Sequence, residues 1–80
     1  MRLDKYLKNS RIIKRRTVAK EACEGGRVSV NGKTAKAGTT VAVGDIIEIR
    51  FGDKTFKAEV TALADHATKD SAKGMYRTIV

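Results

Sequence analysis

Positively charged side chains are concentrated in the first half of this 80-residue chain. Residues 1–36 carry 11 Lys and Arg against three acidic residues, whereas residues 37–80 carry six of each sign, so the net charge of +8 belongs to the first half. Such clustering is typical of a surface that binds a polyanion, although a basic surface that only confers solubility is the alternative. Ten cations are the candidate phosphate contacts: Arg2, Lys5, Lys8, Arg11, Lys14, Arg15, Arg16, Lys20, Arg27 and Lys33.

The acidic residue Asp4 lies among these cations. General acid–base catalysis usually needs a second suitable group, and no second carboxylate accompanies Asp4, so pairing with an arginine is favoured over catalysis. Arginine itself suits phosphate because its planar guanidinium group donates to two oxygens at once. We therefore predict that Asp4 orients Arg2 or Arg16, and we assign no catalytic residue.

Two further reactive side chains have structural interpretations. Cys23 falls on the apolar face of a predicted helix, so a buried thiol is favoured over a nucleophile, and a single cysteine fits a reducing cytosol. His66 is the only histidine and has no Cys or second His nearby, so we predict no metal site. The Gly25-Gly26 and Asn31-Gly32 pairs do not match nucleotide-binding loops, and we expect no cofactor.

Aromatic residues are too few for recognition by base stacking. The chain has two Tyr, two Phe and no Trp. Tyr6 shares the apolar face of its helix, and Phe51 and Phe56 follow the alternation of predicted strands, so all three are expected in the core. The composition therefore favours recognition of a folded nucleic acid by its shape and backbone.

Hydrophobic periodicity predicts two N-terminal helices, over residues 3–9 and Arg15–Glu24. Gly25-Gly26 ends the second helix, because a left-handed cap is favourable mainly for glycine. Ile12 and Ile13 are expected to be buried between the helices. The apolar stripe of the second helix consists of Val18, Ala19, Ala22 and Cys23.

After Gly26 the pattern alternates as in strands, beginning with Val28 and Val30. Asn31-Gly32 predicts a type I′ hairpin turn, because both central residues of that turn need positive φ. Residues 64–74 are polar, with at most one helical turn. The other predicted strands are Lys33–Ala37, Ile46–Phe51, Thr55–Leu63 and, at the edge of the sheet, Met75–Val80.

These elements predict the α+β class, with short N-terminal helices packed on a small antiparallel sheet. We expect one domain over residues 1–80, with its core motif in about residues 1–50 and the C-terminal strands and tail in residues 51–80. No apolar run exceeds three residues, which excludes a membrane-spanning helix and the apolar core of a secretory signal. We therefore expect no association with membranes.

One ordered set of residues carries a resemblance to a known family. The set consists of Arg2-Leu3-Asp4-Lys5, Leu7, Arg16-Thr17, Ala19, Gly26, Val28, Val30, Asn31-Gly32, Gly44-Asp45 and Ile47. In this order they resemble the S-four domain, an RNA-binding module with helices preceding a small sheet. The opening Met1–Lys5, residues 7–17 and Gly74-Met75-Tyr76 are also similar to the family of ribosome-associated quality-control protein P (RqcP), a relative of bacterial heat-shock protein fifteen.

The resemblance implies a non-catalytic, cytoplasmic bacterial factor that acts as a monomer. It implies binding to rRNA of the large ribosomal subunit and to peptidyl-tRNA, after a stalled ribosome has split. The factor would hold the tRNA while a partner, RqcH, supports alanine tailing of the nascent chain. Because Arg2 and Arg16 fall on the family's motif positions, we predict that they are the principal RNA contacts.

Three alternatives remain open from the sequence. The first is a general structured-RNA chaperone or rRNA assembly factor with no preference for subunits that carry tRNA. The second is a fragment of an enzyme, since this module often precedes pseudouridine synthases, but no catalytic domain follows Val80 and we expect none. The third is a protein–protein adaptor whose neutral second half binds a partner while the basic half only confers solubility.

Overall fold

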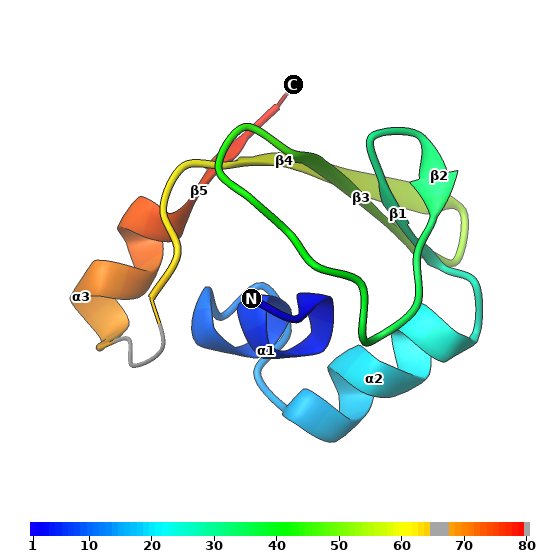
Figure 1. Cartoon of the computed structure of the whole chain (residues 1–80). Helices are drawn as coiled ribbons and strands as arrows, with labels where there is room; N and C mark the ends of the chain where they lie inside the picture. The colour runs from blue at the N-terminus through cyan, green and yellow to red at the C-terminus, as the bar shows by residue number, and fades with distance from the viewer. Residues whose placement is uncertain (65–67, 80) are drawn as a thin grey trace.

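The computed structural model describes residues 1–64 and 68–79, and it confirms the α+β class. Two short helices, α1 (Leu3–Asn9) and α2 (Arg16–Glu24), precede an antiparallel sheet and lie on one side of it (Figure 1). The order of strands across the sheet is β2-β1-β3-β4-β5. The later elements are β1 (Val28–Val30), β2 (Lys33–Thr34), β3 (Ile46–Phe51), β4 (Lys54–Val60), α3 (Lys69–Ala72), η1 (Lys73–Met75) and β5 (Tyr76–Thr78).

The turn between β1 and β2 has the predicted geometry. Asn31 and Gly32 both have positive φ, 53° and 83°, as a type I′ turn requires. The side chain of Asn31 also fixes the next strand, because its Oδ1 accepts a hydrogen bond of 2.9 Å from the backbone N–H of Ile46. Its Nδ2 donates to Oδ1 of Asp45 at 3.1 Å. The hairpin is therefore tied to the start of β3 by side-chain bonds as well as by the sheet.

The hydrophobic core lies between α1 and the sheet. Leu3, Tyr6 and Leu7 are fully buried on the face of α1 that the periodicity predicted. They pack in one cluster with inward-facing residues of the strands, including Ile47 and Ile49 of β3. The hydroxyl of Tyr6 donates a hydrogen bond of 2.6 Å to the backbone carbonyl of Met75, so α1 is also joined to η1 at the far end of the chain. Tyr6 is thus a core residue, as predicted.

Two residues predicted to be in the core are exposed. The side chain of Val18 is 44% exposed, because α2 packs through Ala19, Ala22 and Cys23 and Val18 lies at the border of that stripe. Phe51 is 49% exposed, because it is the last residue of β3 and lies beside the turn into β4. Alternation predicts the correct side of the sheet, but the helices must also extend far enough to cover the residue.

Two predicted strands end earlier than expected because residues that follow them form backbone hydrogen bonds with other segments. The strand predicted over Lys33–Ala37 ends at Thr34, after which the chain crosses α1 and the N–H of Leu3 donates to the carbonyl of Thr39 at 2.7 Å. The strand predicted to reach Leu63 ends at Val60, and the N–H of Thr61 donates to the carbonyl of Met75. The edge strand β5 is present, but Val80 lies outside the described residues, as does His66.

Candidate nucleic-acid interface

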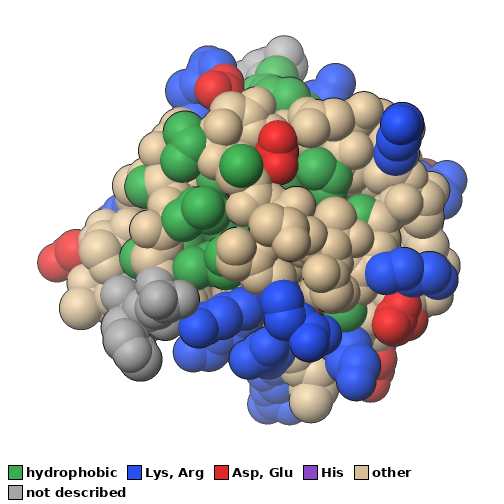
Figure 2. All heavy atoms as spheres, in the orientation of Figure 1, with side chains coloured by type: hydrophobic (Ala, Val, Ile, Leu, Met, Phe, Trp, Pro, Cys, Tyr) green, Lys and Arg blue, Asp and Glu red, His purple; other side chains and the backbone are tan. Residues whose placement is uncertain are grey.

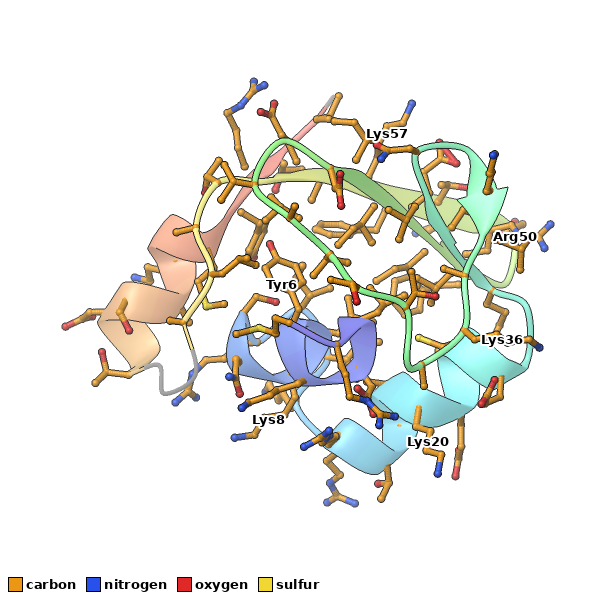
Figure 3. All side chains as sticks on the ribbon, in the orientation of Figure 1. Tyr6, Lys8, Lys20, Lys36, Arg50 and Lys57 are labelled. Atoms are coloured by element: carbon orange, nitrogen blue, oxygen red, sulfur yellow. The ribbon has the colours of Figure 1, made fainter. Side chains whose placement is uncertain are left out.

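Most of the predicted contact residues lie on α1, on α2 or in the linker between them. We call eight of them the basic helix face: Arg2, Lys5, Lys8, Arg11, Lys14, Arg15, Arg16 and Lys20. All are exposed except Lys5, which is partly buried. Figure 2 shows a dense group of Lys and Arg side chains along the lower side of the molecule, where these helices lie. Figure 3 shows Lys8 and Lys20 pointing away from the sheet, so this face is open to a large ligand.

Asp4 joins the two arginines that the sequence singled out. Its side chain is only 3% exposed, whereas those of Arg2 and Arg16 are 55% and 50% exposed. Nε of Arg2 donates to Oδ1 of Asp4 at 3.2 Å, and Nε of Arg16 donates to Oδ2 at 3.4 Å. Because each arginine donates to Asp4 through Nε, that bond leaves the two terminal nitrogens of its guanidinium group as donors for an anion such as phosphate. The prediction named one arginine or the other, and the structure pairs Asp4 with both.

The charge state of Asp4 follows from its surroundings. Burial by itself raises the pKa of this carboxyl group. The backbone N–H of Lys5, which donates to Oδ1 at 2.8 Å, and the charges of Arg16 and Arg2 outweigh that effect, so the pKa of Asp4 lies below its usual value. The carboxylate therefore stays ionised at neutral pH and continues to hold both arginines.

The N-terminus of α2 adds to the positive potential of the basic helix face. No side chain caps this end of the helix, and its first turn contains no acidic residue. The helix dipole places partial positive charge there, next to Arg15 and Arg16. Just before it, Arg11 adopts a φ of 63°, and this left-handed conformation ends α1 and turns the chain toward α2. The linker thus brings the cations of both helices to one region that suits a phosphate backbone.

The remaining two predicted contacts lie elsewhere. Lys33 is on the edge strand β2, and Arg27 lines a hollow in the sheet together with Arg50. The ten cations therefore divide between the helices and the sheet. Sequence reasoning did not select Arg50, because it belongs to the half with no net charge. Its alternation with Ile47 and Ile49 was a usable signal, since it places Arg50 on the outer side of β3.

The other candidate sites carry little reactive chemistry. Cys23 is buried, and burial, followed by the charges of Asp4 and Glu24, raises the pKa of its thiol to about 11. The thiol is thus protonated at neutral pH. Within the described residues, no group of three or more His, Cys, Asp or Glu is placed to hold a metal ion. Across the same part of the chain, no helix has the length and apolar character needed to span a bilayer.

Comparison with known proteins identifies the family. The family model of the S4 domain, the S-four domain of the sequence analysis, matches residues 1–47. A protein of Listeria monocytogenes named RQC P-site tRNA stabilizing factor is 58% identical over 79 residues, which cover 99% of this chain and 86% of that protein. A protein of the same name from Bacillus subtilis is 51% identical over 76 residues, covering 95% of this chain and 88% of that protein. The chain belongs to the S4-domain family of RQC P-site tRNA stabilizing factors.

Solved structures support the same assignment for the fold. A trimeric structure of Vibrio cholerae heat shock protein 15 superposes with a TM-score of 0.90 at 32% identity, covering 99% of this chain and 81% of that chain. The residues matched by the S4 model include Arg2, Asp4 and Arg16, so the arrangement around Asp4 lies within the family's defining segment. Arg50 lies outside that segment.

Replacing Asp4 with Asn tests whether the carboxylate orients the arginines. The variant gains one unit of net positive charge, which alone would tighten RNA binding. We expect the opposite, about three- to tenfold weaker binding, because Asn has one acceptor oxygen in place of two and carries no charge, so at least one guanidinium group loses its acceptor. Fluorescence anisotropy with a labelled structured RNA measures this, and Glu21→Gln on the exposed side of α2 is the matched control. Binding by Asp4→Asn that is as tight as binding by Glu21→Gln contradicts the orienting role.

Proposed function

We propose that this protein is a non-catalytic RNA-binding factor that binds the large ribosomal subunit together with peptidyl-tRNA after a stalled ribosome has split. It holds the tRNA in place during RqcH-dependent alanine tailing of the nascent chain. The observation that carries the proposal is the pair Arg2 and Arg16, fixed by the buried Asp4 on a helix face rich in cations. The names of the relatives, which are 51% and 58% identical, support tRNA as one of its ligands.

The binding energy in this proposal is mainly electrostatic. Phosphate contacts supply most of the affinity of such proteins and carry no sequence information, so selectivity comes from the joint shape of rRNA and tRNA. If about five phosphates are neutralised, the slope of log affinity against log salt concentration is about −3.5 to −4.5, from roughly 0.7 to 0.9 per contact. A slope near zero contradicts electrostatic anchoring by the basic helix face.

The proposed factor acts in the cytoplasm as a monomer and uses no cofactor or metal. Contact with RNA needs no catalytic group, and the proposed interface consists of cations, two of which are held by the carboxylate of Asp4. The fully buried Tyr6 leaves α1 without an exposed aromatic platform for stacking, which favours recognition of a folded RNA backbone. Sedimentation velocity of the purified protein measures its oligomeric state.

Co-sedimentation with large ribosomal subunits tests the proposed function. The subunits are prepared with and without peptidyl-tRNA and mixed with purified protein at near-physiological salt. We expect preference for subunits that carry tRNA, and we expect Arg2→Ala and Arg16→Ala to weaken this binding, because each removes a guanidinium group that Asp4 orients. Lys54→Ala, which removes one exposed charge at the start of β4, is the matched control and should bind normally.

The other outcomes of this experiment correspond to different functions. Equal binding to both kinds of subunit, still dependent on Arg2 and Arg16, indicates a general rRNA assembly factor or RNA chaperone. Binding that tolerates the loss of either arginine indicates a protein–protein adaptor whose neutral half makes the contact. Binding to neither kind of subunit contradicts the ribosomal role altogether.

A further inference from the structure

A hollow of about 290 Å³ lies in the surface of the sheet, away from the basic helix face. It spans four strands and is lined by Arg27, Ser29, Thr34, Glu48, Arg50 and Thr55. Glu48 alternates with the core residues Ile47 and Ile49, so these lining side chains belong to the outer side of the sheet. Figure 3 shows Lys57, which is paired with Glu48 in the sheet, on the opposite side of the strands from Lys8 and Lys20.

The two arginines of the hollow lie directly opposite each other across neighbouring strands. The pairing of Val28 with Ile49 places Arg27 opposite Arg50, and the N–H of Arg50 donates to the carbonyl of Arg27 at 2.9 Å. Like charges in directly opposed positions destabilise a sheet. Among the described residues, neither guanidinium group has a carboxylate within ion-pair distance, and Arg50 donates only a long bond of 3.4 Å to the carbonyl of Gly26.

Among the described residues that line the hollow, the single acidic side chain, Glu48, is paired with a lysine. Oε1 of Glu48 forms an ion pair of 3.3 Å with Nζ of Lys57, which is its neighbour on the adjacent strand. The carboxylate of Glu48 is therefore paired with Lys57 and not with either arginine of the hollow. In the described structure, the hydroxyl groups of Ser29, Thr34 and Thr55 make no hydrogen bonds with other protein groups. The hollow thus combines two guanidinium groups with three hydroxyl donors, which is a donor set suited to an anion with several oxygens.

We propose that this hollow is a second RNA-binding site, which takes a phosphate group of the RNA backbone between Arg27 and Arg50. The proposal rests on the RNA-binding part of the proposed function and adds a second point of contact to it. A bound phosphate relieves the repulsion between the opposed arginines, and the hydroxyl group of Thr55, which is paired with Arg50 in the sheet, is placed beside it as a further donor. Because the sheet separates this site from the basic helix face, the protein contacts two separate stretches of RNA backbone, one on each side.

The test is a titration of the full 15N-labelled chain with a short RNA duplex, followed by NMR. We expect two groups of shifted amide resonances, one on the basic helix face and one in residues 27–29 and 48–50 around the hollow. Arg27→Gln and Arg50→Gln should each remove the second group, retain the first, and reduce the salt slope of RNA binding by about 0.7 to 0.9. Lys54→Gln, which removes an exposed charge from the same sheet, should retain both groups.

The melting temperature gives an independent readout. Removing one of two opposed like charges should leave it unchanged or raise it, whereas loss of a purely structural residue lowers it. The titration of the unmodified protein decides the proposal even if a variant folds poorly.

Three results overturn the second site. If the amides of the helix face shift and those of the hollow do not, the second site is wrong while RNA binding by the helices stands. If neither group shifts, both proposals fail. If a polyglutamate peptide shifts the hollow and the RNA duplex does not, the hollow binds an acidic protein segment instead of RNA.

Discussion

Reversing the charge of Arg16 is expected to weaken binding to large ribosomal subunits by about 30- to 100-fold. The substitution Arg16→Glu removes a guanidinium group that Asp4 holds in place and adds a carboxylate where phosphate is expected. Charge-assisted hydrogen bonds contribute about 1.5 to 3 kcal/mol each, and repulsion between the new carboxylate and phosphate adds to that loss. Co-sedimentation across a range of protein concentrations gives the dissociation constants.

The matched control for this prediction is Lys54→Glu, which changes the net charge by the same amount at the turn between β3 and β4. If net charge alone governs binding, the two variants weaken it equally, and the geometric role of Arg16 is contradicted. Arg16→Gln separates the loss of a cation from the gain of an anion. Its affinity for large ribosomal subunits should lie between those of the unmodified protein and Arg16→Glu. Thermal unfolding by circular dichroism checks that a carboxylate near Asp4 has not disrupted the packing of α1 on α2.

Truncation of Tyr6 is expected to have the largest effect on folding. The ring is fully buried between α1 and the sheet, and its hydroxyl bonds to the carbonyl of Met75 at 2.6 Å. Replacing a buried aromatic ring with alanine costs about 3 to 5 kcal/mol, from lost burial and the cavity left behind. A domain of this size has a free energy of unfolding of only about 4 to 12 kcal/mol. Urea denaturation of Tyr6→Ala should therefore show a protein that is marginally folded at 25 °C.

Tyr6→Phe separates the contribution of the ring from that of the hydroxyl group. It retains the packing and removes one buried hydrogen bond, so we expect a loss of about 1 kcal/mol. The carbonyl of Met75 still accepts from the N–H of Thr61 at 2.9 Å and is not left without a partner. Equal destabilisation by Tyr6→Phe and Tyr6→Ala would contradict the assignment of most of the energy to burial of the ring.

The existence of most elements was predictable because their signals are local. The spacing of Leu3, Tyr6 and Leu7 defines one face of α1, and Asn31-Gly32 prescribes a turn with two positive φ angles. The alternation in residues 46–51 and the Asn-Gly turn are each patterns of a few consecutive residues. The structure contains both the strand and the hairpin that they predict. The concentration of cations on and beside the two helices follows from the same local pattern.

The ends of the strands depended on contacts between residues distant in sequence. The strand after Gly32 ends at Thr34 because the following residues bond to the start of α1, more than 30 residues earlier. The prediction that Val18 and Phe51 are buried was wrong for a similar reason, since the apolar face of an element is buried only where another element covers it. Such coverage is a property of the packed chain that periodicity does not report.

The sequence by itself determined that this protein carries a cationic helix face with a single carboxylate, Asp4, in its opening helix. Only the tertiary structure decided that Asp4 serves both Arg2 and Arg16, because α1 must pack on α2 before residues 12 positions apart can share one carboxylate. Strand pairing likewise decided that Arg27 faces Arg50 across the sheet. Charge and periodicity are local properties that a sequence displays, whereas the partner of each charge is set by which elements meet in the folded chain.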